Sequence, residues 1–239
     1  MAQALVPLKD LVQAKSRLSG LLRPSERRAL AQAMAEDVLA VLSQHAQIDR
    51  VTLVSDDPGA GMLAAQYQVE FWDERTMGAV GLNAVIHAAS ERLLSASASP
   101  LVVLHADLPL LTEADITEVL RVQQQLAGLV IACDQRGTGT NLLAFTRDST
   151  PQFCFGADSC ARHLAVAHAA GMPVQVVRRV GIAVDVDEPQ DMQTVMDALQ
   201  HRRASKTCDL LQGTGLGARV ERALATLDGK SKLDKGMAL

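Results

Sequence analysis

The sequence predicts an α/β protein whose helices cover both faces of a mostly parallel sheet. Through the first 200 residues, short apolar runs alternate with amphipathic segments of helical spacing. Strands that alternate with helices pair in parallel, and the connecting helices bury the sheet on both sides. Hydrophobic residues make up 48% of the 239 residues and charged residues 21%, so the chain can bury a large core without disulfides or a structural metal.

Each short apolar run is expected to form a buried strand. The expected strands are residues 5–7, 51–54, 69–72, 101–104, 129–132, 142–145 and 174–177. The segments between them predict helices. Residues 25–42 and 82–94 each place apolar side chains on one helical face, and Thr112 with Asp115 has the spacing of a helix cap. Ser159 begins a helix that runs to Ala170, and Pro189 fits the first turn of a helix that ends near residue 200.

The charge distribution divides the chain near residue 200. Residues 1–200 carry 15 basic and 23 acidic side chains, a net charge of −8, whereas residues 201–239 carry 8 and 4, a net charge of +4. The second segment also contains five glycines and one helical stretch, residues 218–227. We therefore expect one domain over residues 1–200 and a basic, partly mobile extension over residues 201–239.

Composition disfavours several classes of protein. No apolar run reaches the ~18 residues that cross a membrane, and Lys9 and Asp10 interrupt the first apolar stretch too early for a signal peptide. The four cysteines form no CxxC pair, which favours reduced thiols and a cytoplasmic location. A net charge of −4, with one Trp and one Tyr, does not favour nucleic-acid binding.

The first strand leads into a loop that suits a polyphosphate. Parallel sheets bind ligands at the carboxyl ends of their strands, and Lys9, Lys15 and Arg17 follow this strand. A solvated loop is the alternative. The loop contains neither a Walker A motif nor a Gly-x-Gly-x-x-Gly motif, which disfavours the two common nucleotide-binding folds.

Two other segments are candidate nucleoside contacts. The second strand ends at Ser55 in a Ser-Asp-Asp-Pro sequence, for which turn formation alone is a sufficient explanation and contact to a base or ribose is the alternative. Gly81 and Asn83 lie at the start of a helix, where a flexible helix entry and a nucleotide contact are equally supported.

Carboxylates at two strand ends predict a divalent-cation site. Asp107 follows the apolar run 101–104, where a carboxylate needs a partner. Asp185 and Asp187 alternate on a further expected strand, which puts them on the same face. Because Mg²⁺ takes one or two carboxylates together with substrate phosphates, Asp107 and Asp187 form a candidate site. Helix or turn capping is the alternative for each acid, and His105 is expected to be structural.

A third group of residues suits an anionic ligand. Residues 136–141, Arg-Gly-Thr-Gly-Thr-Asn, offer hydroxyls and open backbone N–H groups. Residues 153–159 lead into a helix whose first N–H groups, together with Ser159, form a cradle for a phosphate or carboxylate, and Arg162 follows in the first turn. The alternative role of Ser159 is an ordinary helix cap, which is compatible with ligand binding.

In this order, the motifs resemble the 2-phospho-L-lactate guanylyltransferase family of coenzyme F-420 biosynthesis. The resemblance covers residues 4–199 and leaves out the rest of the chain. Glu188 departs from it, because the family usually has Thr there; we expect this to change a cap and not the metal site. The motifs are Pro7-x-Lys9, Ala14-Lys15-Ser16-Arg17-Leu18, Gly81-Leu82-Asn83, Ala106-Asp107-Leu108-Pro109-Leu110, Gly137-Thr138-Gly139-Thr140-Asn141, Phe155-Gly156-x-x-Ser159 with Arg162-His163, and Asp185-Val186-Asp187-x-Pro189.

The resemblance implies a three-layer, glycosyltransferase-A-like fold of the nucleotide-diphospho-sugar transferases. It also implies transfer of GMP from GTP to the phosphate of 2-phospho-L-lactate, phosphoenolpyruvate or 3-phospho-D-glycerate, with release of pyrophosphate. The implied site has four parts: Mg²⁺ on Asp107 and Asp187 with Asp185 as a helper; the acceptor on Thr140, Gly156, Ser159 and Arg162; the GTP phosphates on Lys9, Lys15 and Arg17; and the nucleotide near Pro7, Ser55, Gly81 and Asn83.

Three other functions fit the sequence less well than guanylyl transfer. A nucleotidyltransferase for another acceptor, such as molybdopterin, is disfavoured because the first strand does not lead into a Leu-x-Gly-Gly loop. The presence of both acids and the cationic loop argues against a non-catalytic nucleotide-binding protein, and the missing glycine fingerprint argues against a dinucleotide-linked oxidoreductase. The sequence decides neither which three-carbon acid is the acceptor nor the oligomeric state, for which a homodimer is one option.

Overall fold

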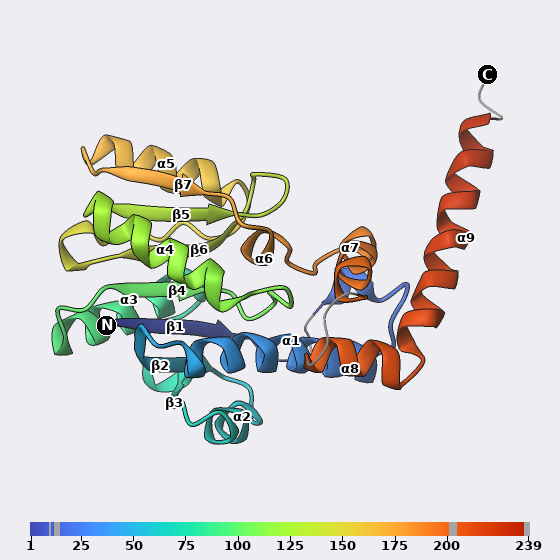
Figure 1. Cartoon of the computed structure of the whole chain (residues 1–239), viewed down its shortest axis with the longest axis horizontal. Coiled ribbons are helices and arrows are strands. Elements are labelled where there is room, and N and C mark those ends of the chain that lie inside the picture. The colour runs from blue at the N-terminus through green and yellow to red at the C-terminus, as the bar shows by residue number, and fades with distance from the viewer. Residues whose placement is uncertain (10, 12–14, 201–204, 237–239) are drawn as a thin grey trace.

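One seven-stranded sheet forms the centre of the molecule, in the order β3-β2-β1-β4-β6-β5-β7 (Figure 1). The computed structural model describes residues 1–9, 11, 15–200 and 205–236, with side chains as far as residue 226. β6 runs antiparallel to its neighbours β4 and β5, and the other pairs are parallel, so the expected mostly parallel sheet is confirmed. The strands are β1 (Ala2–Leu8), β2 (Ile48–Ser55), β3 (Glu70–Asp73), β4 (Leu101–Leu104), β5 (Leu129–Cys133), β6 (Thr140–Phe145) and β7 (Val174–Val177).

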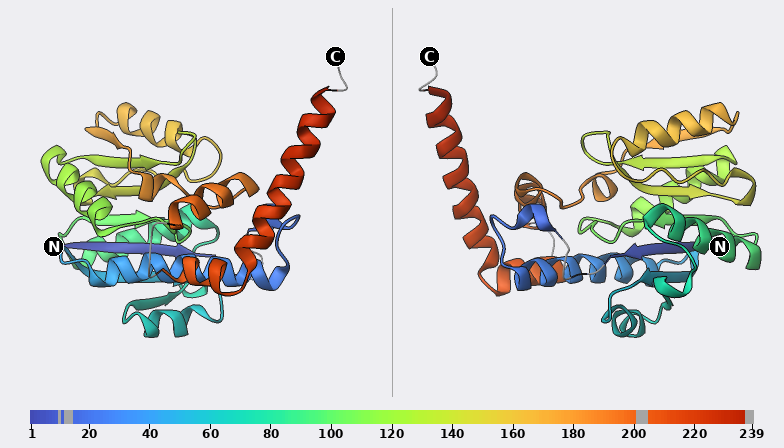
Figure 2. Two further views of the ribbon diagram at one scale, coloured as in Figure 1. Left: turned by 45° about the vertical axis from the view of Figure 1, so that its right-hand side comes forward. Right: turned by 180° about the vertical axis from the view of Figure 1, so that it is seen from behind.

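Helices cover both faces of the sheet, which gives the three layers (Figures 1 and 2). One face packs against α1 (Pro24–Gln44), α2 (Ala60–Gln66) and α4 (Glu113–Leu126), and the other against α3 (Leu82–Ala96) and α5 (Ser159–Ala169). The short helix α6 (Val180–Ala183) precedes α7 (Pro189–Leu199), and 3-10 turns occur at η1 (Ser16–Leu18), η2 (Glu74–Thr76) and η3 (Arg147–Ser149).

Side chains of β4 show how one strand serves both cores. Val102 and Leu104 lie in the cluster under α1 and α4, whereas Leu101 and Val103 lie in the cluster under α3. All four are buried, because alternate residues of a strand point to opposite faces and both faces are covered here. This explains why the strands appear in the sequence as continuous apolar runs.

The C-terminal segment packs against the domain. α8 (Lys206–Gly213) lies along α1, where Asp37 accepts hydrogen bonds from the backbone N–H groups of Lys206 and Thr207. α8 and the start of α9 (Leu216–Gly236) share one apolar cluster with α1 and α7, which contains Leu211, Leu216 and Val220. From there α9 extends away from the rest of the molecule (Figure 1). Residues 205–226 therefore share a core with α1 and α7, although the division at residue 200 stays a prediction.

Two expected helix starts are confirmed. The Thr112 hydroxyl accepts a hydrogen bond from the Asp115 N–H, and the Asp115 carboxylate accepts one from the Thr112 N–H, as in a capping box. Pro189 occupies the first turn of α7. The strand expected around Asp185 and Asp187 is wrong, because residues 184–188 form an irregular connection between α6 and α7. Val184 and Val186 are buried there, Asp185 is partly buried and Asp187 is exposed, so the valines still point inward without a strand.

A disulfide corrects the expectation of reduced thiols for Cys133 and Cys160. Cys133 at the end of β5 is bonded to Cys160 in the first turn of α5, with 27 residues of sequence separation. The two meet because the Cys160 N–H donates to the Thr138 carbonyl, which brings the start of α5 to the β5–β6 loop. Cysteine spacing along the chain does not show such a pairing, because it arises from the fold.

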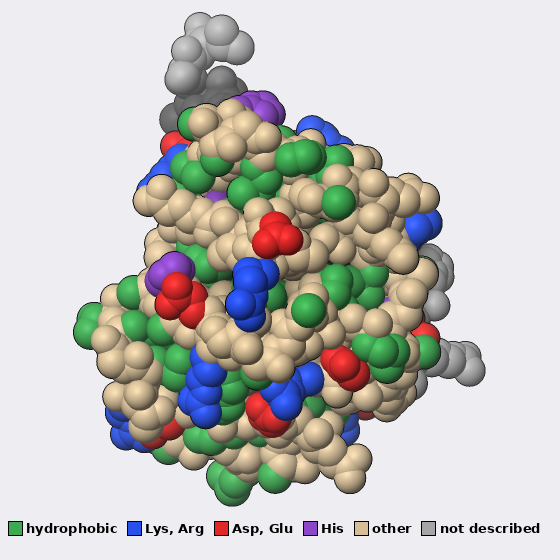
Figure 3. Space-filling view, turned by 90° about the vertical axis from the view of Figure 1, so that its left-hand side faces the viewer, with side chains coloured by type: hydrophobic (Ala, Val, Ile, Leu, Met, Phe, Trp, Pro, Cys, Tyr) green, Lys and Arg blue, Asp and Glu red, His purple; other side chains and the backbone are tan. Residues whose placement is uncertain are grey.

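The face at the amino ends of the parallel strands carries charged side chains of both signs. Lys and Arg side chains are interspersed with Asp and Glu on this face (Figure 3). No helix in the described part of the chain is both long and apolar enough to cross a membrane. The charged groups that were expected to act together lie at the carboxyl ends of the strands.

Candidate active site

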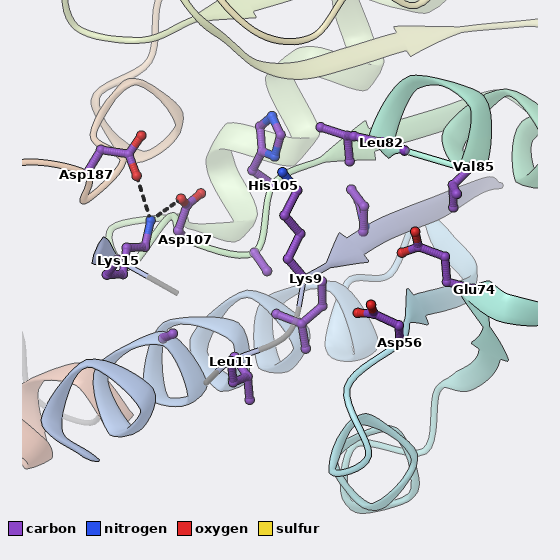
Figure 4. Close-up of a pocket in the computed structure, with 15 residues that line it drawn as sticks. Lys9, Leu11, Lys15, Asp56, Glu74, Leu82, Val85, His105, Asp107 and Asp187 are labelled. Atoms are coloured by element: carbon purple, nitrogen blue, oxygen red, sulfur yellow. Dashed lines mark hydrogen bonds and ion pairs between the residues drawn. The ribbon is translucent and has the colours of Figure 1, made fainter. Parts of the chain in front are cut away.

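A cavity of about 670 Å³ opens at the carboxyl ends of the central strands (Figure 4). Its walls come from the segments that follow β1, β2, β3 and β4, and from the start of α3. This is where a parallel sheet offers a ligand site, because several strand ends converge there with their connecting loops. The lining residues are Pro7, Leu8, Lys9, Leu11, Lys15, Ala31, Asp56, Glu74, Gly81, Leu82, Val85, His105, Ala106, Asp107 and Asp187.

Two acids that are far apart in the sequence converge on one lysine in this cavity. The Lys15 ammonium donates to Asp187 at 2.9 Å and also contacts the carboxylate of Asp107 (Figure 4). The Lys15 side chain is 8% exposed, compared with 27% for Asp107 and 51% for Asp187. The predicted convergence of Asp107 and Asp187 is therefore present, with Lys15 between them.

Charge balance inside this cluster determines its protonation. Burial disfavours charged Lys15, but Asp107 and Asp187 outweigh that effect and hold the pKa of Lys15 above its usual value. Burial also acts to raise the pKa of Asp107, and the charges of Lys15 and His105 more than offset it, so this pKa lies below its usual value. The ion pair is therefore fully charged at neutral pH.

Asp185 differs from Asp107 in the direction of its pKa shift, and its contacts differ from those of Asp107 and Asp187. Burial, and then the negative charge of Asp107, raises the pKa of Asp185 to about 6. The Asn141 amide donates to an Asp185 oxygen at 3.2 Å and to the Ile182 carbonyl at 2.9 Å, which fixes the 182–187 connection to the start of β6. Asp185 thus belongs to the same electrostatic cluster without contacting Lys15 in the way that Asp187 does.

Thr140 and Ser159, two predicted acceptor-binding residues, are in direct contact. The Thr140 N–H donates to the Ser159 hydroxyl at 2.8 Å, and the Thr140 hydroxyl pairs with His163 Nδ1 at 3.0 Å. All three side chains are buried. His163 Nε2 accepts from the Cys154 N–H at 2.9 Å, so Nδ1 carries the proton and donates to Thr140.

Gly156 and Arg162 complete this second group. Gly156 has φ +124°, a region that favours glycine, and a Cβ placed there would meet no atom within 4 Å. Arg162 lies exposed on the first turn of α5. Asn83 holds the loop before Gly156, because its amide exchanges two hydrogen bonds with the Phe155 backbone. Asn83 therefore has a structural role in this structure, and its contacts give no support to a nucleoside role.

Some of the residues predicted to bind the nucleotide line the cavity, and others lie outside its lining. Pro7, Lys9 and Gly81 line the cavity. Arg17 is 69% exposed and lies 3.8 Å from Glu188, the residue at which this sequence departs from the family pattern. Ser55 is buried and its hydroxyl accepts the Asp57 N–H, so its contacts fit the turn interpretation.

Sequence reasoning missed several residues of the site. His163 was noted only within a motif, and its link to Thr140 is a contact across 23 residues that no local pattern shows. Asp57 was attributed to a turn, and it indeed accepts the Gly59 N–H, but it also accepts the Leu11 N–H and so anchors the loop after β1. Asp56 and Glu74 both line the cavity. The Ser-Asp-Asp-Pro sequence that contains Asp56 has base or ribose contact as its alternative role, whereas no local pattern indicates Glu74.

The predicted Mg²⁺ was tested against the donor atoms present. No group of three or more His, Cys, Asp or Glu side chains forms a metal-binding cluster within the part of the chain that is described. Asp107 and Asp187 nevertheless lie close enough to share one ammonium, and Asp107 Oδ1 is buried without a hydrogen-bond partner among the described residues. Two carboxylates and a substrate phosphate are a set that Mg²⁺ accepts, so these residues fit the ion.

Comparison with known structures first defines the class. A crystal structure described as a nucleotide-diphospho-sugar transferase from Desulfovibrio desulfuricans G20 superposes with a TM-score of 0.77 at 18% identity, covering 93% of this chain and 98% of the other. The 4-diphosphocytidyl-2C-methyl-D-erythritol synthase of Anaerococcus prevotii superposes with a TM-score of 0.54 at 14% identity, covering 84% and 96%. At these identities the likeness establishes the fold, that of the nucleotidyltransferases.

Sequence comparison then gives the family. Residues 2–228 match the model described as "Guanylyl transferase CofC like", and the chain belongs to this family. It is 34% identical over 201 residues to the phosphoenolpyruvate guanylyltransferase of Conexibacter woesei, covering 84% of this chain and 89% of that protein. It is 36% identical over 190 residues to the enzyme of the same name from Sphaerobacter thermophilus, covering 80% and 90%. The protein is thus a nucleotidyltransferase of the guanylyltransferase type. The family match continues to residue 228, which corrects the expectation that it ends at residue 199.

Proposed function

We propose that this protein transfers GMP from GTP to the phosphate of a three-carbon phosphorylated carboxylic acid in coenzyme F-420 biosynthesis, releasing pyrophosphate. The family and the names of its relatives support the reaction class. The observation that carries the proposal is the convergence of Asp107, Asp187 and Lys15 at one end of a cavity. The printed name of the relatives favours phosphoenolpyruvate as the acceptor.

The reaction needs positioning and charge neutralisation more than proton transfer. An acceptor phosphate is already anionic at neutral pH, so no general base has to create the nucleophile. One of its oxygens attacks the α-phosphorus of GTP, the bond from that phosphorus to the α–β bridging oxygen breaks, and pyrophosphate leaves with the electron pair. The obstacle is the approach of two anions, and the protein must offset their repulsion.

Lysine side chains in the cavity are suited to that task. Lys9 and Lys15 both line it, and Lys15 is held in its charged form by the acids beside it. These ammonium groups neutralise phosphate charge and orient the triphosphate. Asp107 and Asp187 would hold Mg²⁺, with Asp185 near them, and the bound ion would supply Lewis-acid stabilisation of the phosphate oxygens.

The acceptor binds on the other side of Asp107 and Asp187, on β6 and α5. The Asn141 side chain contacts Asp185, and its neighbour Thr140 contacts Ser159, so the acid cluster and the predicted acceptor residues are joined through the start of β6. The open space above Gly156 and the first turn of α5 admit a phosphate or carboxylate at a helix N-terminus. This arrangement supports binding of acceptor and nucleotide on opposite sides of the proposed metal position.

Pyrophosphate release from GTP, measured with Mg²⁺ and each of the three acids in turn, tests the proposal. We expect turnover with at least one acid, and a loss of at least about 100-fold in kcat for Asp107→Asn, the scale set by removing one electrostatic contact to a transition state. Asp49→Asn is the matched control, because Asp49 is exposed at the amino end of β2, away from the cavity. Substantial turnover by Asp107→Asn, with folding confirmed by circular dichroism, would refute the role of this site.

A further inference from the structure

Two carboxylates of the cavity have no role in the mechanism above. Asp56 follows β2 directly, and Glu74 follows β3 at the start of η2. Both line the cavity, and Lys9 separates them from Asp107 and Asp187 (Figure 4). Burial and the charge of Asp56 raise the pKa of Glu74, while Lys9 lowers it, so the three groups lie within electrostatic reach of one another.

The order of the strands arranges the functional groups in a line along the carboxyl edge of the sheet. Glu74 follows β3, Asp56 follows β2, Lys9 follows β1 and Asp107 lies beyond β4. Adjacent strands are ~4.8 Å apart, so the segment after β3 lies about 10 Å from the segment after β1. On the far side of β4, β6 carries Thr140.

With the acceptor on the proposed side, this line indicates the direction in which the nucleotide lies. The reacting α-phosphate has to meet the acceptor, which belongs to the β6 side, and the phosphates need the cations that follow β1. The ribose and base therefore extend toward β2 and β3. Carboxylates at that end would repel phosphates, which is a second reason to place the uncharged nucleoside there. Leu82 and Val85 of α3 also line the cavity and provide apolar surface for the face of a ring.

Guanine is the base that a carboxylate matches best. Its N1–H and 2-amino group are adjacent donors that point in the same direction, and a carboxylate presents two acceptor oxygens and no donor. Adenine offers an acceptor beside one amino group, cytosine likewise, and uracil one N–H between two carbonyls. None of these three edges gives paired donors to a carboxylate.

We propose that Glu74 selects guanine by accepting hydrogen bonds from N1–H and the 2-amino group of GTP, and that Asp56 contacts the ribose hydroxyls. This inference rests on the proposed function, since it assigns the nucleoside end of the same site. Glu74 follows the edge strand β3, which is the position of the base in this orientation of GTP. Asp56 follows β2, one strand nearer to the phosphates.

The test compares GTP, ITP and XTP as substrates of the full-length protein. ITP lacks the 2-amino group, and XTP replaces it with a carbonyl that a carboxylate repels. The wild type should prefer GTP to ITP by about 10- to 100-fold in kcat/KM, the range for a hydrogen bond to a charged group. Glu74→Gln should lower kcat/KM for GTP by a similar factor, reduce the preference over ITP to less than about threefold, and raise kcat/KM for XTP, because its amide can donate to the 2-carbonyl.

Two further variants separate selectivity from structural damage. Glu70→Gln changes the same residue type at the start of β3, where Glu70 pairs with Arg50 outside the cavity, and should leave all three substrates unaffected. Asp56→Asn should lower kcat/KM for GTP and ITP by the same factor. An unchanged GTP-to-ITP ratio in Glu74→Gln, or a collapse of that ratio in Asp56→Asn instead, would overturn the assignment.

Failure of the proposed function gives a different result. If the wild type releases no pyrophosphate with any of the three acids, the reaction assignment fails, and the Glu74 inference is then decided by calorimetric binding of GTP, ITP and XTP. Selective GTP binding that Glu74→Gln abolishes supports the inference in that case. Binding that does not distinguish GTP from ITP in the wild type contradicts it.

Discussion

Acid should destabilise the protein through His163, and the size of the effect follows from its contacts. Its side chain is fully buried, Nε2 accepts the Cys154 N–H, and Nδ1 donates to Thr140. Burial, and then the charge of Arg162, lowers the pKa of His163 to about 4 from its ordinary 6.5. As the pH falls, the unfolded chain binds this proton at a higher pH than the folded chain does. The contribution of His163 to the free energy of unfolding is therefore fully present above about pH 6.5 and is lost as the pH falls toward 4.

A pKa of about 4 against 6.5 corresponds to at most about 3 kcal/mol of folding free energy, or about 1 kcal/mol per pH unit near pH 5. Asp185 acts in the opposite direction. Its raised pKa of about 6 makes the folded state bind its proton first, so this group adds stability as the pH falls from 6 toward 3.8. The pH profile of the wild type alone therefore does not isolate His163.

Comparison with His163→Asn does isolate it. Urea unfolding without nucleotide or added divalent metal, at intervals from pH 7 to pH 4, gives the free energy of unfolding of both proteins. The advantage of the wild type over the variant should shrink by about 3 kcal/mol across this range. His87→Asn is the control, since it makes the same substitution at a side chain that is 57% exposed. Parallel profiles for His163→Asn and the wild type would show that the reasoning is wrong.

Two more predictions concern stability. Cys133→Ser should lower the free energy of unfolding by about 3–4 kcal/mol, because the disulfide to Cys160 closes a loop of 27 residues. Dithiothreitol should lower the Tm of the wild type and leave the Tm of the variant unchanged. A wild-type Tm that does not respond to dithiothreitol would argue against the disulfide. Gly181→Ala should lower the free energy of unfolding by about 1–3 kcal/mol, because a Cβ there would meet Asp115 and stand 2.6 Å from the Leu110 carbonyl oxygen. Gly213→Ala, where a Cβ has open space, should lower it by less than about 1 kcal/mol. Equal Tm changes in the two variants would contradict this packing argument.

The fold was predictable from the sequence because its strands are buried on both faces. Residues 101–104 show the principle: their short, continuous apolar run is typical of a strand that is buried on both faces. The helices α2, α6 and α8 were missed. α2 is short, and α8 depends on Asp37, which is distant in the sequence and satisfies two of its N-terminal N–H groups.

The candidate site was predictable where function leaves a local pattern. Asp107 was found because a carboxylate after an apolar strand needs a partner, and that partner is Lys15 from a different loop. Asn83 is a contrasting case: the helix start beside glycines supported a flexible helix entry and a nucleotide contact equally, and the Asn83 amide binds the Phe155 backbone 72 residues away. The disulfide and the contact of His163 with Thr140 likewise depend on pairs that meet only in the folded chain.

The structure of the reaction product tests the central claim most directly. After incubation with GTP, Mg²⁺ and phosphoenolpyruvate, phosphorus NMR and mass spectrometry of the purified guanosine product would identify the bond that has formed. The predicted product joins the α-phosphorus of GTP to the phosphate of the acid and shows two mutually coupled phosphorus doublets, with one pyrophosphate formed per product. Recovery of GDP with inorganic phosphate, or of GMP alone, would contradict transfer to the acceptor phosphate.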